Sequence, residues 1–124
     1  MADEKIILVI DDDPDILDSV KAILSSNGFK VETALTGKEG LELVEKVSPA
    51  LVLVDMMMES IDAGSKVAHK IRESDQKLPV YLLSSIGSAT AANIEIDKLG
   101  FNGVFQKPVD PDNLVSSVKR TLGL

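Results

Sequence analysis

The chain has 124 residues, with 13 lysines and arginines against 20 aspartates and glutamates, which gives a formal net charge of −7. This length favours a single domain over residues 1–124 that is large enough to bury a hydrophobic core. The acidic balance, without any block of Lys or Arg, argues against binding to nucleic acid. Cysteine is absent, and neither a membrane span nor a signal sequence is visible, so we expect a cytoplasmic protein without membrane attachment.

Five short apolar runs along the chain predict buried β-strands. The first is a continuous run of β-branched residues and leucine, which is typical of a strand covered on both faces, and we interpret the others in the same way. The five predicted strands are Lys5–Ile10, Val31–Leu35, Leu51–Val54, Val80–Leu83 and Gly103–Phe105.

Between the strands, apolar residues recur at helical spacing and predict five amphipathic helices. Their apolar positions are Leu17, Val20 and Leu24; Leu41 and Val44; Val67 and Ile71; Ala89, Ala92, Ile96 and Leu99; and Leu114, Val118 and Leu122. Helix starts are indicated by Asp13-Pro14, by Asp110-Pro111 and by a capping box of Thr36 and Glu39, and helix ends by Gly28 and Gly100. The alternation of strand and helix predicts an α/β fold, a doubly wound parallel sheet with helices on both faces.

Polar residues stand where four of the predicted strands end. Asp11 and Asp12 follow the first strand, Asp55 the third, Ser84 the fourth, and Lys107 comes shortly after the fifth. Because the carboxyl ends of parallel strands lie side by side, we expect these residues to meet in one crevice.

Three converging carboxylates repel one another, so the crevice is predicted to hold a cation. Mg²⁺ is the natural candidate, since it prefers oxygen ligands and binds one or two carboxylates together with phosphate oxygens. The ammonium of Lys107 supplies complementary charge, and Ser84 adds a hydroxyl. An aspartate placed between Mg²⁺ and lysine is able to attack phosphorus and carry an acyl phosphate.

This ordered set resembles the receiver domain of response regulators in two-component signalling, over residues Lys5 to about Leu122. The resemblance implies a CheY-like, flavodoxin-like sheet with strand order 2-1-3-4-5. It also implies that Asp55 accepts a phosphoryl group from a histidine kinase or phosphotransfer protein and that phosphorylation then changes binding to a downstream effector protein. Such a domain is not an enzyme in the usual sense, because it catalyses only its own phosphotransfer and dephosphorylation.

The resemblance also implies individual roles at the site. Asp12 and Asp55 would bind Mg²⁺ directly, Asp11 largely through water, and the backbone carbonyl of Met57 would be a further ligand. Ser84 and Lys107 would contact the phosphoryl group, and Pro108 would limit the backbone that aims Lys107.

Two departures from the family pattern leave an alternative open. Glu59 replaces a common proline, and Val104 replaces the aromatic residue that usually stands three positions before the lysine. In the family this aromatic ring follows the hydroxyl toward the phosphoryl group, and valine has no ring to move. The alternative is therefore a degenerate receiver that acts as a phosphorylation-independent protein-binding module.

Two other classes on the same fold fit the sequence less well. An FMN-binding protein needs a phosphate-cradling loop after the first strand, whereas Asp11, Asp12 and Asp13 would repel phosphate unless a cation intervened. The haloacid-dehalogenase-like phosphohydrolases place a second aspartate two residues after the nucleophile, where this chain has Met57.

Overall fold

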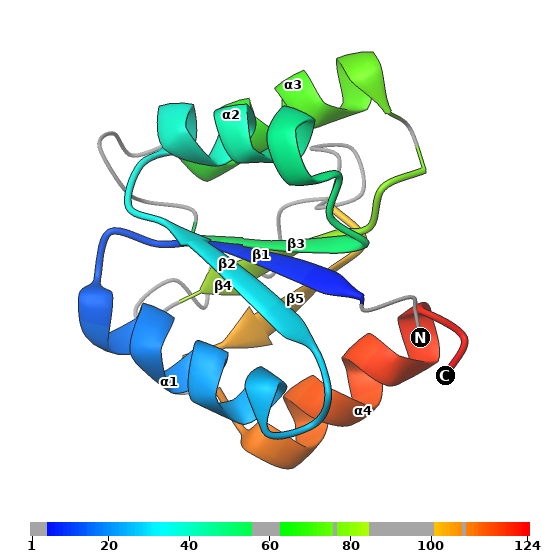
Figure 1. Ribbon diagram of the computed structural model, residues 1–124. Helices are drawn as coiled ribbons and strands as arrows, with labels where there is room; N and C mark the ends of the chain where they lie inside the picture. The colour runs from blue at the N-terminus through cyan, green and yellow to red at the C-terminus, as the bar shows by residue number, and fades with distance from the viewer. Residues whose placement is uncertain (1–4, 56–62, 76, 85–100, 108) are drawn as a thin grey trace.

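Five parallel strands form one sheet in the order β2-β1-β3-β4-β5, as predicted (Figure 1). The computed structural model describes residues 5–55, 63–75, 77–84, 101–107 and 109–124. The strands are β1 (Ile6–Ile10), β2 (Lys30–Ala34), β3 (Leu51–Asp55), β4 (Val80–Ser84) and β5 (Gly103–Gln106). The last three extend one residue beyond their predicted ends, so that Asp55 and Ser84 belong to the strands themselves.

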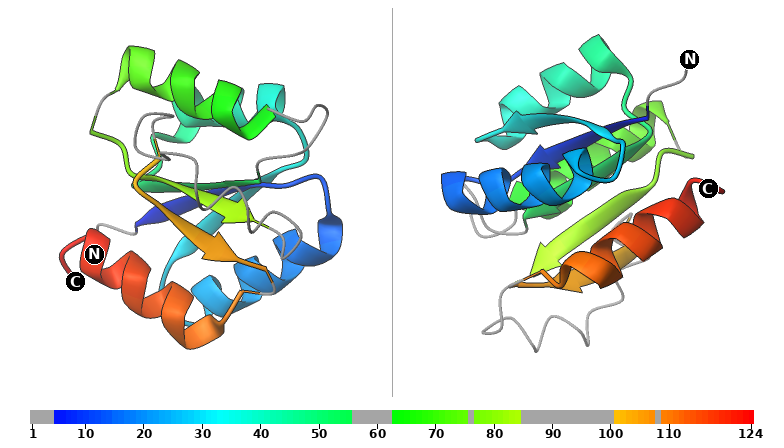
Figure 2. Two further views of the ribbon diagram at one scale, coloured as in Figure 1. Left: turned by 180° about the vertical axis from the view of Figure 1, so that it is seen from behind. Right: turned by 60° about the horizontal axis from the view of Figure 1, so that its bottom comes forward.

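Four helices lie within the described residues, two on each face of the sheet. They are α1 (Pro14–Ser25), α2 (Gly37–Val47), α3 (Ala63–Ser74) and α4 (Pro111–Thr121). α1 and α4 cover one face, while α2 and α3 cover the other (Figures 1 and 2). The predicted helix around Ala89–Leu99 lies outside the described residues. None of the described helices combines the length and the apolar character needed to cross a membrane.

The side-chain caps form at the predicted helix starts. Asp13 Oδ1 accepts the backbone N–H of Asp15 at the start of α1, over 2.9 Å. Asp110 Oδ2 accepts the N–H of Asn113 at the start of α4, over 3.0 Å. After α1, Gly28 adopts φ of 90°, a backbone conformation that favours glycine. These local signals mark the starts of α1 and α4 and the end of α1, whereas Gly100, the other predicted helix end, lies outside the described residues.

The entry into α2 corrects two details of the sequence analysis. Thr36 Oγ1 accepts the N–H of Glu39 as predicted, over 3.1 Å. The Glu39 carboxylate accepts the N–H of Leu35 over 2.9 Å, one residue before the usual partner in a capping box. Because its N–H bonds to this side chain, Leu35 lies outside β2, and 47% of the residue is exposed. The prediction that β2 includes Leu35 was therefore wrong.

Alternate residues of the central strands point into two separate hydrophobic clusters. Ile7 and Val9 of β1 pack toward α1 and α4, whereas Leu8 and Ile10 pack toward α3 and the partly buried residues of α2. This alternation follows from the pleat of a strand, and it confirms that the sheet is covered on both faces. With both faces packed, the central strands hold the residues that follow them in fixed positions.

α2 packs closely on the sheet at Gly40, where the absence of a side chain makes room for Ile10. A Cβ atom added at Gly40 would overlap Cδ1 of Ile10 and lie 2.7 Å from its Cγ1. Ile10 is fully buried in a closely packed cluster, so its side chain would have to displace neighbours in order to move.

We therefore expect Gly40→Ala to destabilise the protein by about 1–3 kcal/mol, because overpacking outweighs the gain in helix propensity. Urea denaturation followed by far-UV circular dichroism measures this change. Glu42→Ala, at an exposed position of the same helix, is the matched control and is expected to stay within about 0.5 kcal/mol of wild type. A Gly40→Ala variant more stable than wild type would contradict the close approach.

Candidate functional site

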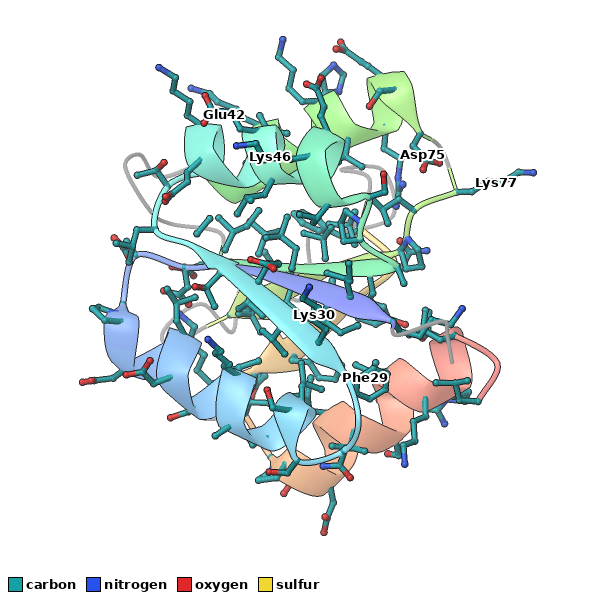
Figure 3. All side chains as sticks on the ribbon, viewed as in Figure 1. Phe29, Lys30, Glu42, Lys46, Asp75 and Lys77 are labelled. Atoms are coloured by element: carbon teal, nitrogen blue, oxygen red, sulfur yellow. The ribbon has the colours of Figure 1, made fainter. Side chains whose placement is uncertain are left out.

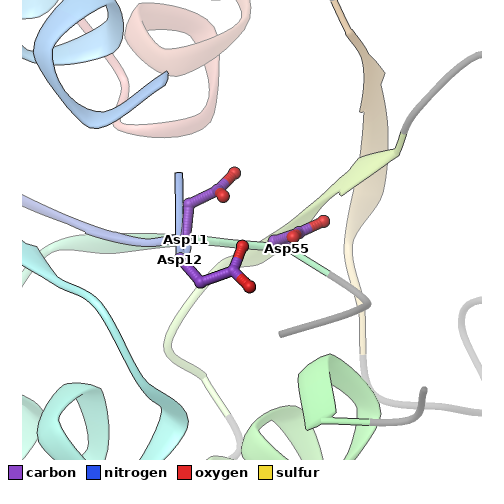
Figure 4. A group of neighbouring side chains, drawn as sticks. All are labelled: Asp11, Asp12 and Asp55. Carbon is purple, nitrogen blue, oxygen red and sulfur yellow. The ribbon is translucent and has the colours of Figure 1, made fainter. Parts of the chain in front are cut away.

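Four of the five polar residues predicted to meet, namely Asp11, Asp12, Asp55 and Lys107, do so at the carboxyl ends of the strands. Asp11 and Asp12 follow β1, Asp55 ends β3, and the three carboxylates point into the same space (Figure 4). One carboxylate oxygen from each lies within 4.8 Å of the others. The ammonium of Lys107, which follows β5, contacts the carboxylates of Asp11 and Asp55. Residues far apart in the chain thus form one charged cluster.

Asp11 is the most deeply buried member of the cluster, with no exposed surface. Its backbone N–H extends the β1–β2 ladder by donating to Ala34 O over 3.1 Å. Its Oδ1 accepts the N–H of Asp13 over 2.9 Å, and its Oδ2 lies 2.8 Å from Lys107 Nζ. The carboxylate is therefore fixed both by the loop that follows it and by the lysine. The contact with Asp13 is a common turn pattern, in which an aspartate side chain accepts the N–H two residues later.

Lys107 is held at the site by its backbone as well as by its side chain. Its N–H donates to Ser84 O over 2.7 Å, which ties the residue after β5 to the end of β4. Its ammonium lies 3.3 Å from Asp55 Oδ1, in addition to the contact with Asp11. Burial by itself lowers the pKa of Lys107, but the close contact and charge of Asp11, and then those of Asp55, outweigh it and raise the pKa above the ordinary 10.5. The ammonium is therefore fully charged at neutral pH.

The carboxylate group has the chemistry of a site for a hard divalent cation. Its ligand atoms are oxygens from three carboxylates, which Mg²⁺ prefers over nitrogen or sulfur. No described residue donates a well-directed hydrogen bond to the buried Oδ2 of Asp11, whose partner is the ammonium of Lys107. One ammonium also leaves an excess of negative charge beside three carboxylates. Asp11, Asp12 and Asp55 could therefore hold a metal ion.

The remaining predicted site residues are placed as follows. Ser84 is 5% exposed at the end of β4, one residue beyond Leu83, which is the register partner of Asp55. Val104 lies on β5 and is 37% exposed. Met57 and Pro108 fall outside the described residues, as does Glu59. Their predicted roles stay predictions.

The comparison with family models decides which family this site belongs to. A model described as the response regulator receiver domain matches residues 7–119. The chain belongs to this family. Receiver domains are the signalling modules of response regulators in two-component systems, and the matched range contains every described residue of the site.

Individual relatives agree with the family match. Response regulator Rre1 from Synechocystis sp. is 36% identical over 125 residues, which cover 98% of this chain and 53% of Rre1. The chain spans about half the length of this and of other curated relatives that it matches.

Solved structures show the same fold. A putative response regulator from Chloroflexus aurantiacus superimposes with a TM-score of 0.88 at 27% identity, covering 98% of this chain and 100% of that one. A CheY-like response regulator receiver domain protein from Methanospirillum hungatei gives 0.86 at 29% identity, covering 98% and 95%.

The ion pair between Lys107 and Asp11 predicts a large effect on stability when the lysine is neutralised. In the absence of divalent cations, we expect Lys107→Met to lower the free energy of unfolding by about 2–4 kcal/mol, because it leaves a buried carboxylate without its counter-ion. Urea denaturation in the presence of a chelator measures this change. Lys21→Met, at an exposed position of α1, is the control and is expected to have little effect. Equal stabilities of the two variants would contradict the importance of the ion pair.

Proposed function

We propose that Asp55 accepts a phosphoryl group from a histidine kinase or phosphotransfer protein and that its phosphorylation changes binding to a downstream effector protein. The observation that carries this proposal is the meeting of Asp55 with two further carboxylates and the Lys107 ammonium at one edge of the sheet. Membership of the receiver family supports the same assignment. As part of this proposal, residues 1–124 form a single cytoplasmic domain that binds neither nucleic acid nor membrane.

Asp55 is the nucleophile in this reaction. One of its carboxylate oxygens attacks phosphorus, the bond from phosphorus to the donor breaks, and an acyl phosphate remains on the side chain. The neighbouring Lys107 keeps its proton and places a fixed positive charge beside the oxygens of the transferred group. The chain catalyses only this transfer and the later hydrolysis of its own phosphoryl group.

The acidic group supplies the ligands for Mg²⁺. Asp12, which is exposed, and Asp55 would bind the ion directly, and the backbone carbonyl of Met57 would be a further ligand. Asp11 already faces Asp13 N–H and Lys107, so we assign it a contact through water. When bound, Mg²⁺ would neutralise negative charge on the transferring phosphoryl oxygens.

Phosphorylation would change the partners of Lys107 and Ser84. In the unmodified protein the Lys107 ammonium is shared between Asp11 and Asp55. A phosphoryl group on Asp55 adds oxygen acceptors that favour a state in which Lys107 and the Ser84 hydroxyl contact it. Pro108 would restrict the backbone that aims Lys107 during this change.

The exposed Val104 favours one alternative function. It presents an aliphatic side chain on β5, without a ring to move toward the phosphoryl group. A receiver without this element would serve as a phosphorylation-independent protein-binding module. Phosphorylation that requires Mg²⁺ and alters the protein's binding surface separates the switch from this module.

A small phosphoryl donor tests whether Asp55 is the phosphoryl acceptor. Incubation with acetyl phosphate and Mg²⁺ is expected to add the mass of one phosphoryl group to the wild-type protein. Asp55→Asn is expected to abolish the adduct, because an amide is not a competent nucleophile here. Intact-protein mass spectrometry measures both results. The absence of any wild-type adduct, or an adduct that survives Asp55→Asn, would refute the assignment of Asp55.

Substitution of Asp12 tests whether its carboxylate is a metal ligand. Asp12→Asn is expected to weaken Mg²⁺ binding by about tenfold or more, since it removes a charged ligand from the group. Isothermal titration calorimetry measures the dissociation constant. Asp13→Asn removes the same charge from the neighbouring residue and keeps an equally good helix cap, so it is the matched control. Equal weakening by both substitutions would indicate a general charge effect in place of ligation by Asp12.

A further inference from the structure

β5 is the strand whose position along the sheet is least determined by packing. It lies at the edge and pairs only with β4, as the left view of Figure 2 shows with β5 in orange. Of its four residues, Phe105 is buried, while Val104 and Gln106 are exposed and Gly103 has no side chain. A slip of one residue would turn Phe105 to the other face, but a slip of two residues would not. Such a slip would move Lys107 by about 6.6 Å along the strand.

Asn102, which directly precedes β5, fixes the register at the amino end of the strand. Its backbone N–H donates to Val80 O over 2.7 Å, and its side-chain Oδ1 accepts the N–H of Val80 over 2.9 Å. Both backbone polar groups of Val80 are thus paired with a single residue. We call these two hydrogen bonds the Asn102–Val80 pairing. The bond to Oδ1 needs a side-chain acceptor oxygen at position 102, so it depends on the identity of the residue.

Arg72, near the end of α3, holds the Asn102 side chain in this pairing. Its Nη2 donates to Asn102 Oδ1 over 2.7 Å, and its Nη1 donates to the carbonyl oxygens of Leu78 over 2.6 Å and of Asp75 over 3.1 Å. The guanidinium therefore joins α3, the turn that follows it and the start of β5. Figure 3 marks this turn with Asp75 and Lys77. Charged hydrogen bonds of this kind are stronger than neutral ones.

We propose that Arg72 and Asn102 are positioning residues for Lys107, an inference that rests on the proposed function of the site. Asn102 stands at the amino end of β5, five residues before Lys107, and Arg72 of α3 acts through its hydrogen bond to Asn102. At the carboxyl end of β5, the backbone of Lys107 is held by the hydrogen bond from its N–H to Ser84 O. While the Asn102–Val80 pairing is intact, β5 stays in register and the ammonium stays in contact with Asp11 and Asp55. Without it, the lysine leaves the site while the carboxylates on the central strands remain.

Amide hydrogen exchange of the unphosphorylated protein tests this placement directly. In Arg72→Met and Asn102→Ala, the Lys107 amide is expected to exchange about tenfold faster or more, whereas amides of β1 and β3 keep their rates. Asn102→Asp retains the acceptor oxygen and is expected to restore slow exchange. Arg120→Met is the matched control, since Arg120 is exposed and its guanidinium donates to Ser117 Oγ within α4, far from Lys107 in the chain. Three outcomes would overturn the proposal. They are equally faster amide exchange at Lys107 and in β1 and β3, an unchanged exchange rate of the Lys107 amide, or failure of Asn102→Asp to restore slow exchange.

A double-mutant cycle tests whether Arg72 acts through Lys107 in the reaction. The lifetime of the phosphoryl adduct is measured after removal of acetyl phosphate, for wild type, Arg72→Met, Lys107→Met and the double variant. Arg72→Met is expected to change the lifetime in the wild-type background and to have no further effect once Lys107 is replaced. The same change in both backgrounds, or no change in either, would overturn the positioning role.

The two experiments separate this proposal from the proposed function. If wild type forms no adduct, the assignment of Asp55 fails, but the exchange rates still decide whether Arg72 and Asn102 place Lys107. If the adduct forms and Arg72→Met leaves the exchange rate of the Lys107 amide unchanged, the proposed function stands and the positioning role fails.

Discussion

The structure depends above all on the ion pair between the buried Asp11 carboxylate and the Lys107 ammonium, which lie 2.8 Å apart. A carboxylate without solvent is strongly destabilising unless an opposite charge compensates it. The two residues follow different strands, β1 and β5, which are separated in the sheet by β3 and β4. The pair therefore forms only when all of these strands are assembled in the correct order. It links the completion of the sheet to the completion of the site.

Negative charge exceeds positive charge at this site, and the excess gives the site its chemistry. Three carboxylates meet one ammonium within the described residues, so a phosphoryl group would be repelled without additional positive charge. The same excess of negative charge suits a divalent cation, and in the proposed function a bound cation would favour binding of the phosphoryl group. Asp55 adjoins both the acidic pair and the lysine, with its Oδ1 3.3 Å from Lys107 Nζ. In the proposed function, this position would let a metal ion and the ammonium both act on the phosphoryl group carried by Asp55.

The carboxylates and the ammonium of the site follow strands that differ in how fully they are packed. Asp11 and Asp55 adjoin β1 and β3, whose apolar residues are packed on both faces. Lys107 follows an edge strand that buries a single large side chain, Phe105. Phe105 stacks on Tyr81 with ring centroids 5.2 Å apart, and the Tyr81 hydroxyl lies 2.6 Å from Thr121 Oγ1 of α4. Movement of β5 would therefore reach α4 through these contacts, on the face of the sheet away from α2 and α3.

The sequence alone determined the number of strands, the caps of α1 and α4 and the identity of the charged cluster, because these follow from local patterns such as the apolar run before Asp11 and the pair Asp13-Pro14. The convergence of Asp11, Asp55 and Lys107 was also predictable, since parallel strands bring their carboxyl ends to one edge. Only the tertiary structure decided that Lys107 lies closer to Asp11 than to Asp55, and that Asn102 and Arg72 bracket the far end of β5. No local pattern marks those contacts, because they join residues brought together by the register of neighbouring strands and by the docking of a helix against them.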